Sequence, residues 1–285
     1  MAKPFVNPFV SGQFLELRVD ALVSDGRGLG RHDGVVVLVE DALPGQLVRA
    51  RVAAVRKSLA EAALVEVLER SPDEQEPPCP HAGRCGGCSW QSLAYGRQLA
   101  WKERIVHDAL ERVGKVACPP MLPILPSPSE WGYRNKMEFA FGVSGDGGKA
   151  LGLRERGSRN IVEVTGCLLQ TPLTMRVLEA VRMLSNGAFH DLDGRFLVVR
   201  EPNAGGCFVE LIVGAGGSLE AGERFAEALR AETPEVTGFA LSERLAPSDV
   251  AYGERALYAD GRLEERIGDV RLQMGHNAFF QVNTP

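Results

Sequence analysis

Short hydrophobic runs, broken by Gly and Pro, fill residues 14–70 and show no helical periodicity. The runs are FLELRVDALV, VVVLVE, LVRARVAAVR and AALVEVLER. Runs of this length, rich in β-branched residues and separated by turn residues, predict four or five β-strands. Short strands following one another in this way favour a small all-β domain, a closed or partly closed barrel of the OB-like kind.

The glycines of GRGLG at residues 26–30 invite comparison with a dinucleotide-binding fingerprint. That motif needs a helix directly after the glycines, because the helix N-terminus holds the pyrophosphate. Here the β-branched run Val35–Val39 follows instead. The glycines therefore predict a hairpin loop with positive φ angles rather than a cofactor site.

The next part of the chain predicts two linkers that flank a helix. SPDEQEPP at 71–78 is the first linker, and CPPMLPILPSPSE at 118–130 is the second. Between them, residues 97–114 place apolar side chains along one predicted helical stripe that ends at Gly114, a plausible C-terminal cap. The stripe consists of Leu99, Val106, Leu110 and Val113.

The remainder alternates strand and helix patterns. Two helices are predicted, one from Pro172 to Gly187 and one over SLEAGERFAEALRAE at 218–232. The predicted strands cover residues 133–142, 149–155, 160–166, 195–201, 207–214, 236–243 and 269–275. This order predicts an α+β domain with a mainly antiparallel sheet.

Composition narrows the class of protein. The chain has 285 residues, 45% of them hydrophobic and 24% charged, as in an ordinary globular protein of two or three modules. No apolar run reaches the length of a bilayer span, and the N-terminus lacks the apolar core of a signal peptide. A cytoplasmic protein is expected, in which clustered cysteines indicate metal or redox chemistry more often than disulfides.

The formal net charge of −5 is spread unevenly. Residues 131–160 carry six Lys or Arg against three acids, whereas residues 216–270 carry six Arg against twelve acids. A local basic surface on an acidic chain is compatible with nucleic-acid binding, although a solvated charged surface explains it equally well.

Three cysteines lie within ten residues, in CPHAGRCGGC at 79–88. Their spacing, C-x5-C-x2-C, brings three thiols together. A tetrahedral metal site needs one more ligand. Zinc and iron–sulfur clusters both accept four thiolates, but structural zinc sites usually pair two C-x2-C knuckles and only one is present. The pattern favours an iron–sulfur cluster. Composition alone leaves Cys118, Cys167 and Cys207 nearly equal as the fourth ligand.

Several motifs together resemble one family. DGRGLGRHDG with VVVLVEDALPGQLVRARV resembles the TRAM domain, an RNA-binding β-barrel. CPHAGRCGGCSWQ, YRNKMEFAFG, LGLRERGSRNIVEVTGC and GHNAFFQVN resemble, in this order, the RNA uracil-5-methyltransferases of the 23S rRNA type. The resemblance covers nearly the entire chain.

The resemblance implies a set of ligands and binding residues. A [4Fe–4S] cluster is implied on Cys79, Cys85, Cys88 and Cys167. S-adenosylmethionine is the implied methyl donor, with Gln281 contributing to cofactor binding and Phe279 to the pocket for a flipped-out uridine. Basic side chains are expected to bind RNA phosphates, namely Arg134, Lys136, Arg154, Arg156 and Arg159.

The family's chemistry uses a cysteine thiolate that adds to C6 of uracil, followed by methylation at C5 and removal of the C5 proton. In the family, the cofactor domain that carries this cysteine follows the FFQVN motif, and the present chain stops at Pro285. Cys118 lacks a neighbouring cation or helix N-terminus that would lower its pKa. The expectation is therefore a C-terminally truncated chain that has no catalytic residue and cannot transfer a methyl group alone.

The expected organisation has four parts. These are a TRAM-like barrel at 1–72, an iron–sulfur segment with a helix at 73–117, a central α+β RNA-recognition domain at 118–275, and the start of a missing methyltransferase domain at 276–285. The expected partner is RNA, favoured to be 23S rRNA, with no membrane and a monomeric state.

Two other functions remain open. One is a zinc-bound, non-catalytic RNA-binding module, and the other is an electron-transfer iron–sulfur protein. The cluster's expected role is a fold staple or a platform for RNA, with redox sensing as the alternative, because methyl transfer from a sulfonium needs no electron.

Overall fold

A computed structural model describes residues 7–214 and 216–284. The chain divides into two compact units. Unit 1 takes in the described residues up to Gly83 together with Cys88–Ser127. Unit 2 takes in Arg84–Gly87 and the described residues from Pro128 onward. The four-part division expected from the sequence is finer than this and stays a prediction.

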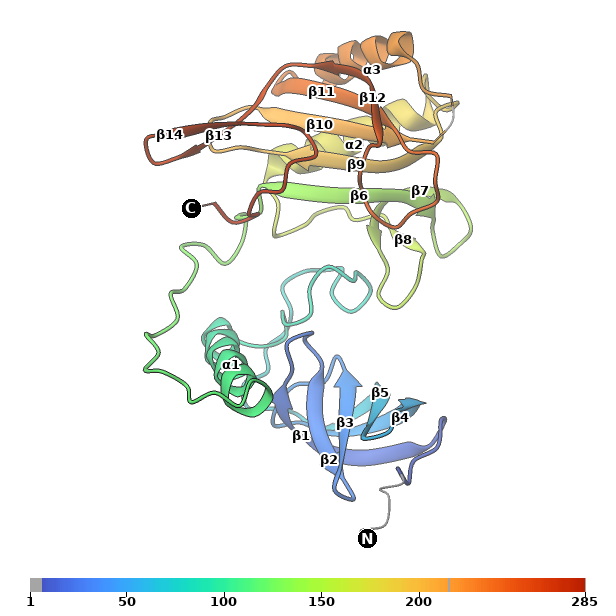
Figure 1. The fold of residues 1–285 in the computed structure, drawn as a ribbon. Coiled ribbons are helices and arrows are strands. Elements are labelled where there is room, and N and C mark those ends of the chain that lie inside the picture. Colours follow the sequence, from blue (N-terminus) through green and yellow to red (C-terminus); the bar gives the residue numbers. More distant parts are fainter. Residues whose placement is uncertain (1–6, 215, 285) are drawn as a thin grey trace. The chain divides into compact units, whose positions relative to one another are not determined.

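Unit 1 is built on a closed five-stranded barrel with the strand order β1-β2-β3-β5-β4 (Figure 1). The strands are β1 (Phe14–Leu22), β2 (Gly28–His32), β3 (Val35–Glu40), β4 (Leu47–Val55) and β5 (Leu59–Glu69). Neighbouring strands are antiparallel except β3 and β5, which are parallel. Alternate side chains of β1, such as Leu15, Leu17 and Val19, fill the interior. The predicted barrel is therefore confirmed.

The glycine-rich stretch is a strand in the structure, and the predicted loop is confirmed only at its start. Gly26 has a φ of 94° and forms the turn, but Gly28 and Gly30 belong to β2. A Cβ on Gly28 would lie 2.7 Å from the Ala42 carbonyl oxygen, and one on Gly30 would lie 2.3 Å from that of Arg18. These glycines let other backbone segments approach a barrel strand closely, which is a packing reason that composition does not reveal.

The predicted helix is present, but it buries a different side chain. Helix α1 (Tyr95–Asp108) continues into a turn of π-helix, η1 (Ala109–Val113), and Gly114 caps its end as predicted. Trp101 is the buried residue of α1, packed with Leu22, Leu43 and Leu93. The predicted apolar stripe is wrong in part, because Val106 and Val113 are 52% and 82% exposed.

Unit 2 is a seven-stranded sheet in the order β12-β11-β10-β9-β6-β7-β8. Its strands are β6 (Lys136–Val143), β7 (Lys149–Arg154), β8 (Ile161–Val162), β9 (Gly194–Arg200), β10 (Cys207–Val213), β11 (Val236–Glu243) and β12 (Arg255–Asp260). Every neighbouring pair is antiparallel except β10 with β11. The mainly antiparallel sheet is confirmed, and β12 was not foreseen.

Helices α2 (Pro172–Asn186) and α3 (Leu219–Glu232) pack on the same face of this sheet. Thr171 caps α2 by accepting a hydrogen bond from the Thr174 N–H, Pro172 fills the first turn, and Gly187 ends the helix. Ser218 caps α3 in the same way. Both helix predictions are confirmed.

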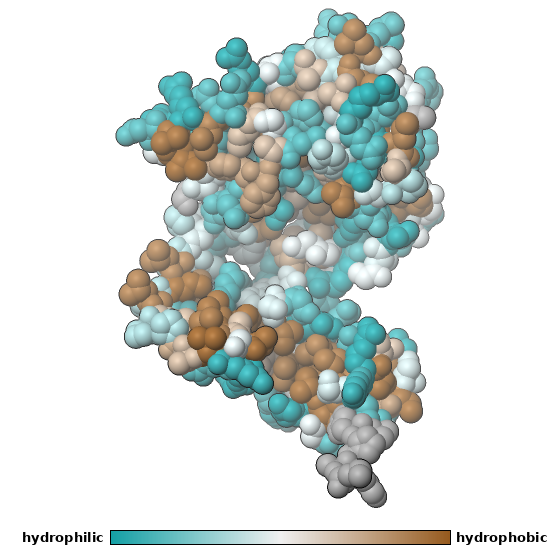
Figure 2. Space-filling model, in the orientation of Figure 1, coloured by the Kyte–Doolittle hydropathy of each residue, from teal (hydrophilic) through white to brown (hydrophobic). Residues whose placement is uncertain are grey.

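The other face of the sheet is covered without a helix. Residues around Ala251, the hairpin of β13 (Leu263–Ile267) and β14 (Val270–Met274), and the segment that follows it lie over this face (Figure 1). In Figure 2 a hydrophobic patch lies where Figure 1 labels the hairpin, whose Ile267, Val270 and Leu272 are exposed. Among the described residues, no helix combines the length and the apolar character needed to cross a bilayer.

Candidate functional site

The GHNAFFQVN motif, residues 275–283, begins with a turn in which the Ala278 N–H donates to the Gly275 carbonyl at 2.9 Å, and it continues as an irregular segment outside the sheets. Burial alternates strictly along it: residues 275, 277, 279, 281 and 283 are exposed, and the residues between them are half-buried. Phe279 and Gln281, predicted to bind substrate and cofactor, are therefore both exposed, with Phe279 84% accessible.

Backbone contacts hold this segment on unit 2. The Arg200 Nη2 donates to the Ala278 carbonyl at 2.7 Å. The Asn135 backbone N–H donates to the Val282 carbonyl at 2.9 Å, and the Asn135 side-chain amide donates to the Gln281 carbonyl at 3.1 Å. Phe280, which faces inward, lines a small cavity with Arg200 and Leu263. The exposed side chains are thus fixed through main-chain contacts that do not involve them.

The arginines predicted to bind phosphate gather on the loop after β7. Arg154 donates to the Arg159 carbonyl at 2.6 Å, and Arg156 donates its backbone N–H to the Arg84 carbonyl at 2.8 Å. The Gly86 N–H donates to the Arg154 carbonyl at 3.0 Å. The backbones of Cys85 and Glu155 pair in an isolated antiparallel β-bridge. The Arg84–Gly87 stretch thereby joins unit 2 and brings a fourth arginine, which the sequence motifs did not point to.

An acid that was not foreseen neutralises part of this basic loop. The two carboxylate oxygens of Asp249 lie 3.4 Å from Arg154 Nη2 and 3.5 Å from Arg159 Nη2. Both Asp249 and Arg159 are well exposed, at 67% and 87% of their side-chain surface. Nothing in the sequence marks Asp249, because it stands about 90 residues from its partners in an acidic region.

Arg134 and Lys136 lie at the start of β6, and both side chains already have hydrogen-bond partners. The Arg134 Nε donates to the Lys136 carbonyl at 2.9 Å, and Lys136 Nζ lies 2.5 Å from Glu138 Oε1. The Lys136 side chain is 23% exposed. Their predicted phosphate contacts stay predictions.

The predicted cluster ligands fall in both units. Cys79 and Cys88 belong to unit 1, whereas Cys85 and Cys167 belong to unit 2. All four are partly exposed, and the Gly87 N–H donates to Cys85 Sγ at 3.4 Å. Within residues 7–214 and 216–284, no group of three or more His, Cys, Asp and Glu side chains is arranged to hold a metal ion. The iron–sulfur cluster stays a prediction.

Cys207 and Cys118 differ from these four in their surroundings. Cys207 opens β10 and is fully buried, and this burial raises the pKa of its thiol far above the ordinary value. A protonated thiol is a poor metal ligand and nucleophile. Cys118 lies in the Pro-rich stretch of unit 1, as the sequence predicts.

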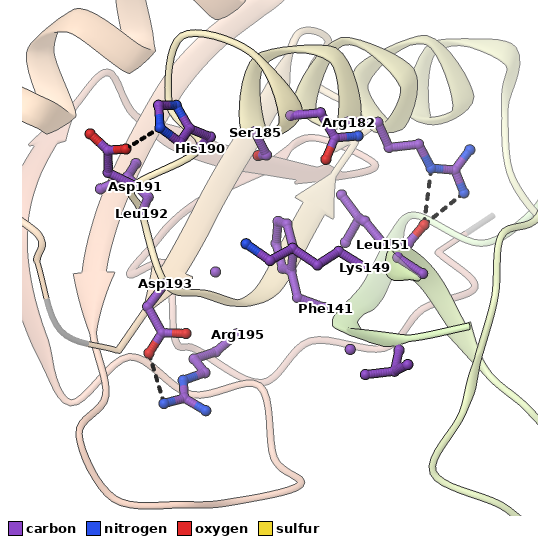
Figure 3. Close-up of a pocket in the computed structure, with 15 residues that line it drawn as sticks. Phe141, Lys149, Leu151, Arg182, Ser185, His190, Asp191, Leu192, Asp193 and Arg195 are labelled. Carbon is purple, nitrogen blue, oxygen red and sulfur yellow. Dashed lines mark hydrogen bonds and ion pairs between the residues drawn. The ribbon is translucent and has the colours of Figure 1, made fainter. Parts of the chain in front are cut away.

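A separate open hollow of about 420 Å³ lies in unit 2 between the β6–β7 hairpin and the end of α2. Figure 3 shows Lys149 directed into it above Phe141, while the ion pairs Asp193–Arg195 at 2.8 Å and His190–Asp191 at 2.6 Å form its rim. Arg182, which also lines the hollow, donates to the Leu151 carbonyl at 2.7 Å. None of the residues predicted to bind RNA, cofactor or metal lines the described part of this hollow.

Comparisons with known proteins match this architecture. Residues 8–65 match the TRAM domain family, which coincides with the barrel. A relative from Nitratidesulfovibrio vulgaris, described as an uncharacterized RNA methyltransferase, is 45% identical over 97% of this chain and 62% of its own length. A second from Thermosynechococcus vestitus, described in the same way, is 33% identical over 96% of this chain and 62% of its own length.

A solved structure shares the fold. The Pyrococcus abyssi tRNA (uracil-54, C5)-methyltransferase in complex with S-adenosyl-L-homocysteine matches 94% of this chain and 61% of its own chain. The TM-score is 0.68 at 23% sequence identity, which shows a common fold. The chain thus carries a TRAM domain and is similar over nearly all its length to RNA methyltransferases, and it spans about 62% of the length of the curated relatives it matches.

These matches correct one expectation. The sequence predicts a chain that is inactive by itself because its catalytic domain is absent. That expectation is contradicted: methyltransferase relatives align with about 97% of the chain, and its structure matches a methyltransferase solved with S-adenosyl-L-homocysteine. The residue at which the chain ends is no ground for inferring inactivity.

Proposed function

We propose that the chain binds RNA as part of an S-adenosylmethionine-dependent RNA (uracil-5-)-methyltransferase. The observation that carries this proposal is the 45% identity to an RNA methyltransferase along 97% of the chain. The TRAM region on the barrel supports RNA as the partner. The likeness in fold to a tRNA (uracil-54, C5)-methyltransferase supports uracil C5 as the methylated atom.

Each group of residues has a proposed task. The arginines on the loop after β7 contact phosphates, because guanidinium groups bind phosphate oxygens in a bidentate fashion. Phe279 offers an exposed ring on which a flipped-out uridine stacks. Gln281, which is also exposed, hydrogen-bonds the bound methyl donor. The donor supplies an electrophilic methyl group, and these side chains bind and orient the reactants.

The proposed substrate is 23S rRNA rather than transfer RNA. The support is the cysteine-rich CPHAGRCGGC sequence, which resembles the branch of the family that acts on ribosomal RNA. The competing substrate is suggested by the solved tRNA methyltransferase. Methylation assays on both RNAs separate the two, with 5-methyluridine quantified by mass spectrometry after reaction with the purified protein and S-adenosylmethionine.

RNA binding by the chain itself is the direct test of this function. Fluorescence anisotropy of a uridine-containing single-stranded RNA is measured at several KCl concentrations. Affinity should fall with a log–log slope of about −0.7 for each phosphate contacted. The double variant Arg154→Gln, Arg159→Gln should bind more weakly and show a shallower slope. Arg176→Gln, which removes another exposed arginine paired with an acid, is the matched control. Binding that does not depend on salt would contradict the proposal.

We infer that Cys79, Cys85, Cys88 and Cys167 bind a [4Fe–4S] cluster that stabilises the fold. Four thiols are the right number and kind of ligand, and a backbone N–H donated to Cys85 Sγ is the type of contact that such sulfurs receive. Folding and cluster binding are then coupled, as for other metal-stapled segments.

Two matched cysteine variants test the ligand set. Cys167→Ser should lose iron after anaerobic purification, whereas Cys207→Ser should retain it because that thiol is buried in the core. Equal iron loss in both would refute the choice of Cys167. Stoichiometric zinc in place of iron, without visible absorbance, would support the zinc-bound alternative.

A further inference from the structure

Two oppositely charged side chains are buried beneath residues 275–283 of unit 2. Arg200 at the end of β9 is 5% exposed, and Glu210 in the middle of β10 is 2% exposed. Burying an ionised side chain costs free energy unless charges and hydrogen bonds compensate it. A role for these two residues has to be sought in what they contact.

The sheet register places both on the face that the helices leave uncovered. Arg200 lies opposite Phe208, and Glu210 lies opposite Val198, so the two charges are diagonal neighbours on adjacent strands. Burial lowers the pKa of Arg200, and the negative charges of Glu210 and Glu138 act in the opposite direction. The two charges compensate each other only in part, because Arg200 Nε and Glu210 Oε1 are buried without a hydrogen-bond partner among the described residues.

Both side chains reach the same segment. Arg200 Nη2 donates to the Ala278 carbonyl at 2.7 Å, and Glu210 Oε1 lies 3.7 Å from His276 Nε2. A Cβ on Gly253 would lie 2.7 Å from Glu210 Oε1, so a loop closes over the carboxylate. The Asn277 side chain donates to the Gly253 carbonyl at 3.0 Å, which ties this loop to the segment as well.

The contacts fall just before the exposed functional side chains. His276 and Ala278 face inward, and Phe279 and Gln281 follow on outward-facing positions. Asn135 fixes the other end at Gln281 and Val282. Because Phe279 directly follows Ala278 in the chain, a shift of the Ala278 main chain also moves the Phe279 ring.

We propose that Arg200 and Glu210 are positioning residues that hold residues 276–283 so that Phe279 and Gln281 project together toward substrate and cofactor. The inference rests on the function proposed above for these two side chains. Neither Arg200 nor Glu210 touches the reactants. Arg200 acts through the main chain of the segment at Ala278, and Glu210 acts through the His276 side chain.

The test replaces both charged side chains at once, so that neither remains buried without its opposite charge. The double variant Arg200→Met, Glu210→Gln keeps side chains of similar size, whereas Arg200→Met alone would leave Glu210 uncompensated and could prevent folding. Arg200→Lys keeps one donor and should restore part of the effect. Arg182→Met is the matched control, because Arg182 is also a largely buried arginine that donates to main-chain carbonyls, at Leu151 and Val164.

The first measurement is chymotrypsin cleavage after Phe279 and Phe280, followed by mass spectrometry under conditions in which circular dichroism shows folded protein. Loss of a charge-assisted hydrogen bond should accelerate cleavage at this site by about tenfold or more in the double variant. Arg182→Met should leave the rate unchanged. An unchanged rate in the double variant would overturn the positioning pair.

The second measurement separates positioning from general stabilisation. Phe279→Ala should weaken RNA binding in the wild-type background and have little further effect in the double variant, because the ring is already misplaced. Fully additive effects would overturn the positioning role even if cleavage is faster. Absence of RNA binding by the wild-type chain would contradict the proposed function, whereas unchanged cleavage with intact RNA binding would contradict the positioning pair alone.

Discussion

Asp260 is the acidic residue with the most complete set of partners in the described sheet of unit 2. Arg230 donates to its two carboxylate oxygens at 2.9 and 2.5 Å, the Phe239 N–H donates at 3.1 Å, and the Tyr258 hydroxyl donates as well. The hydrogen bonds from Arg230 are the main reason that the pKa of Asp260 is lowered. Ionised Asp260 therefore stabilises the folded state.

Replacing Asp260 by Asn should lower the free energy of unfolding by about 1–3 kcal/mol at pH 7. A carboxyl group whose folded-state pKa is below its unfolded value of about 3.9 contributes stability above that pH, and the contribution is lost as the pH falls through the folded-state pKa. The difference between wild type and variant should therefore shrink as the pH falls below about 4. Urea unfolding at pH 7, 5 and 3 measures this difference in the free energy of unfolding. Asp269→Asn, at an exposed position, is the control.

An equal loss of stability at pH 3 and pH 7 would contradict this account of Asp260.

For single residues, residue type alone predicts some functional candidates but not their partners. Clustered cysteines and arginines stand out in the sequence, whereas Phe279 is singled out only by the family resemblance. Glu210 is also visible, as a lone acid in the apolar run CFVELIV, but its contact with His276 is set by tertiary packing between segments far apart in the chain.

Helix α3 holds a glycine where alanine would normally be favoured. Gly222 is buried, and a Cβ there would lie 2.4 Å from Tyr258 Cβ and 3.3 Å from Leu241 Cβ. The missing side chain lets the helix approach β11 and β12 closely. Packing therefore explains this glycine, and intrinsic helix propensity does not.

Gly222→Ala should destabilise unit 2 by about 1–3 kcal/mol, since the clash outweighs the gain in helix propensity. Gly96→Ala in α1 is the matched control. A Cβ on Gly96 would meet no described atom within 4 Å beyond its own helix, so this exchange should stabilise by about 0.5–1 kcal/mol. Chemical denaturation of both variants measures whether each substitution raises or lowers the free energy of unfolding. Stabilisation by Gly222→Ala would show that the helix can move away from the sheet at little cost.

Elements with strong periodicity and clear caps were predictable, and elements shaped by close contacts were not. Pro172, Gly187 and Ser218 mark helix ends in the sequence, and the structure confirms them. Strand β2 was hidden because its glycines signal a loop, although they serve close packing in the barrel. Trp101 replaced the predicted stripe in α1 because its burial depends on leucines of other segments.

The whole molecule combines two units whose general classes were visible in the sequence. The barrel followed from its short strands, and the α+β unit followed from its alternating helices and strands. The assignment of Arg84–Gly87 to unit 2 was not foreseeable, because it depends on backbone hydrogen bonds to Arg154 and Arg156, about 70 residues later in the chain. Local patterns carry no information on such pairings.

The net charge of −5 means that any RNA binding has to come from local positive surface rather than from the chain as a whole. Asp249 sits against two of the arginines that would supply this surface, with its oxygens 3.4 and 3.5 Å from Arg154 and Arg159. A carboxylate in this position occupies the guanidinium groups that an RNA phosphate would contact. Binding of RNA then requires that these two exposed ion pairs be exchanged for phosphate contacts.

Asp249→Asn should therefore raise RNA affinity by about threefold to tenfold, since exposed ion pairs are worth up to about 1 kcal/mol each. Asp269→Asn changes the net charge by the same amount at an exposed site and should have a smaller effect. In the Arg154→Gln, Arg159→Gln background the gain from Asp249→Asn should vanish. Anisotropy titrations at one KCl concentration compare the variants. Equal gains from the two aspartate substitutions would mean that RNA responds to the charge of the whole chain, with no particular role for this arginine pair.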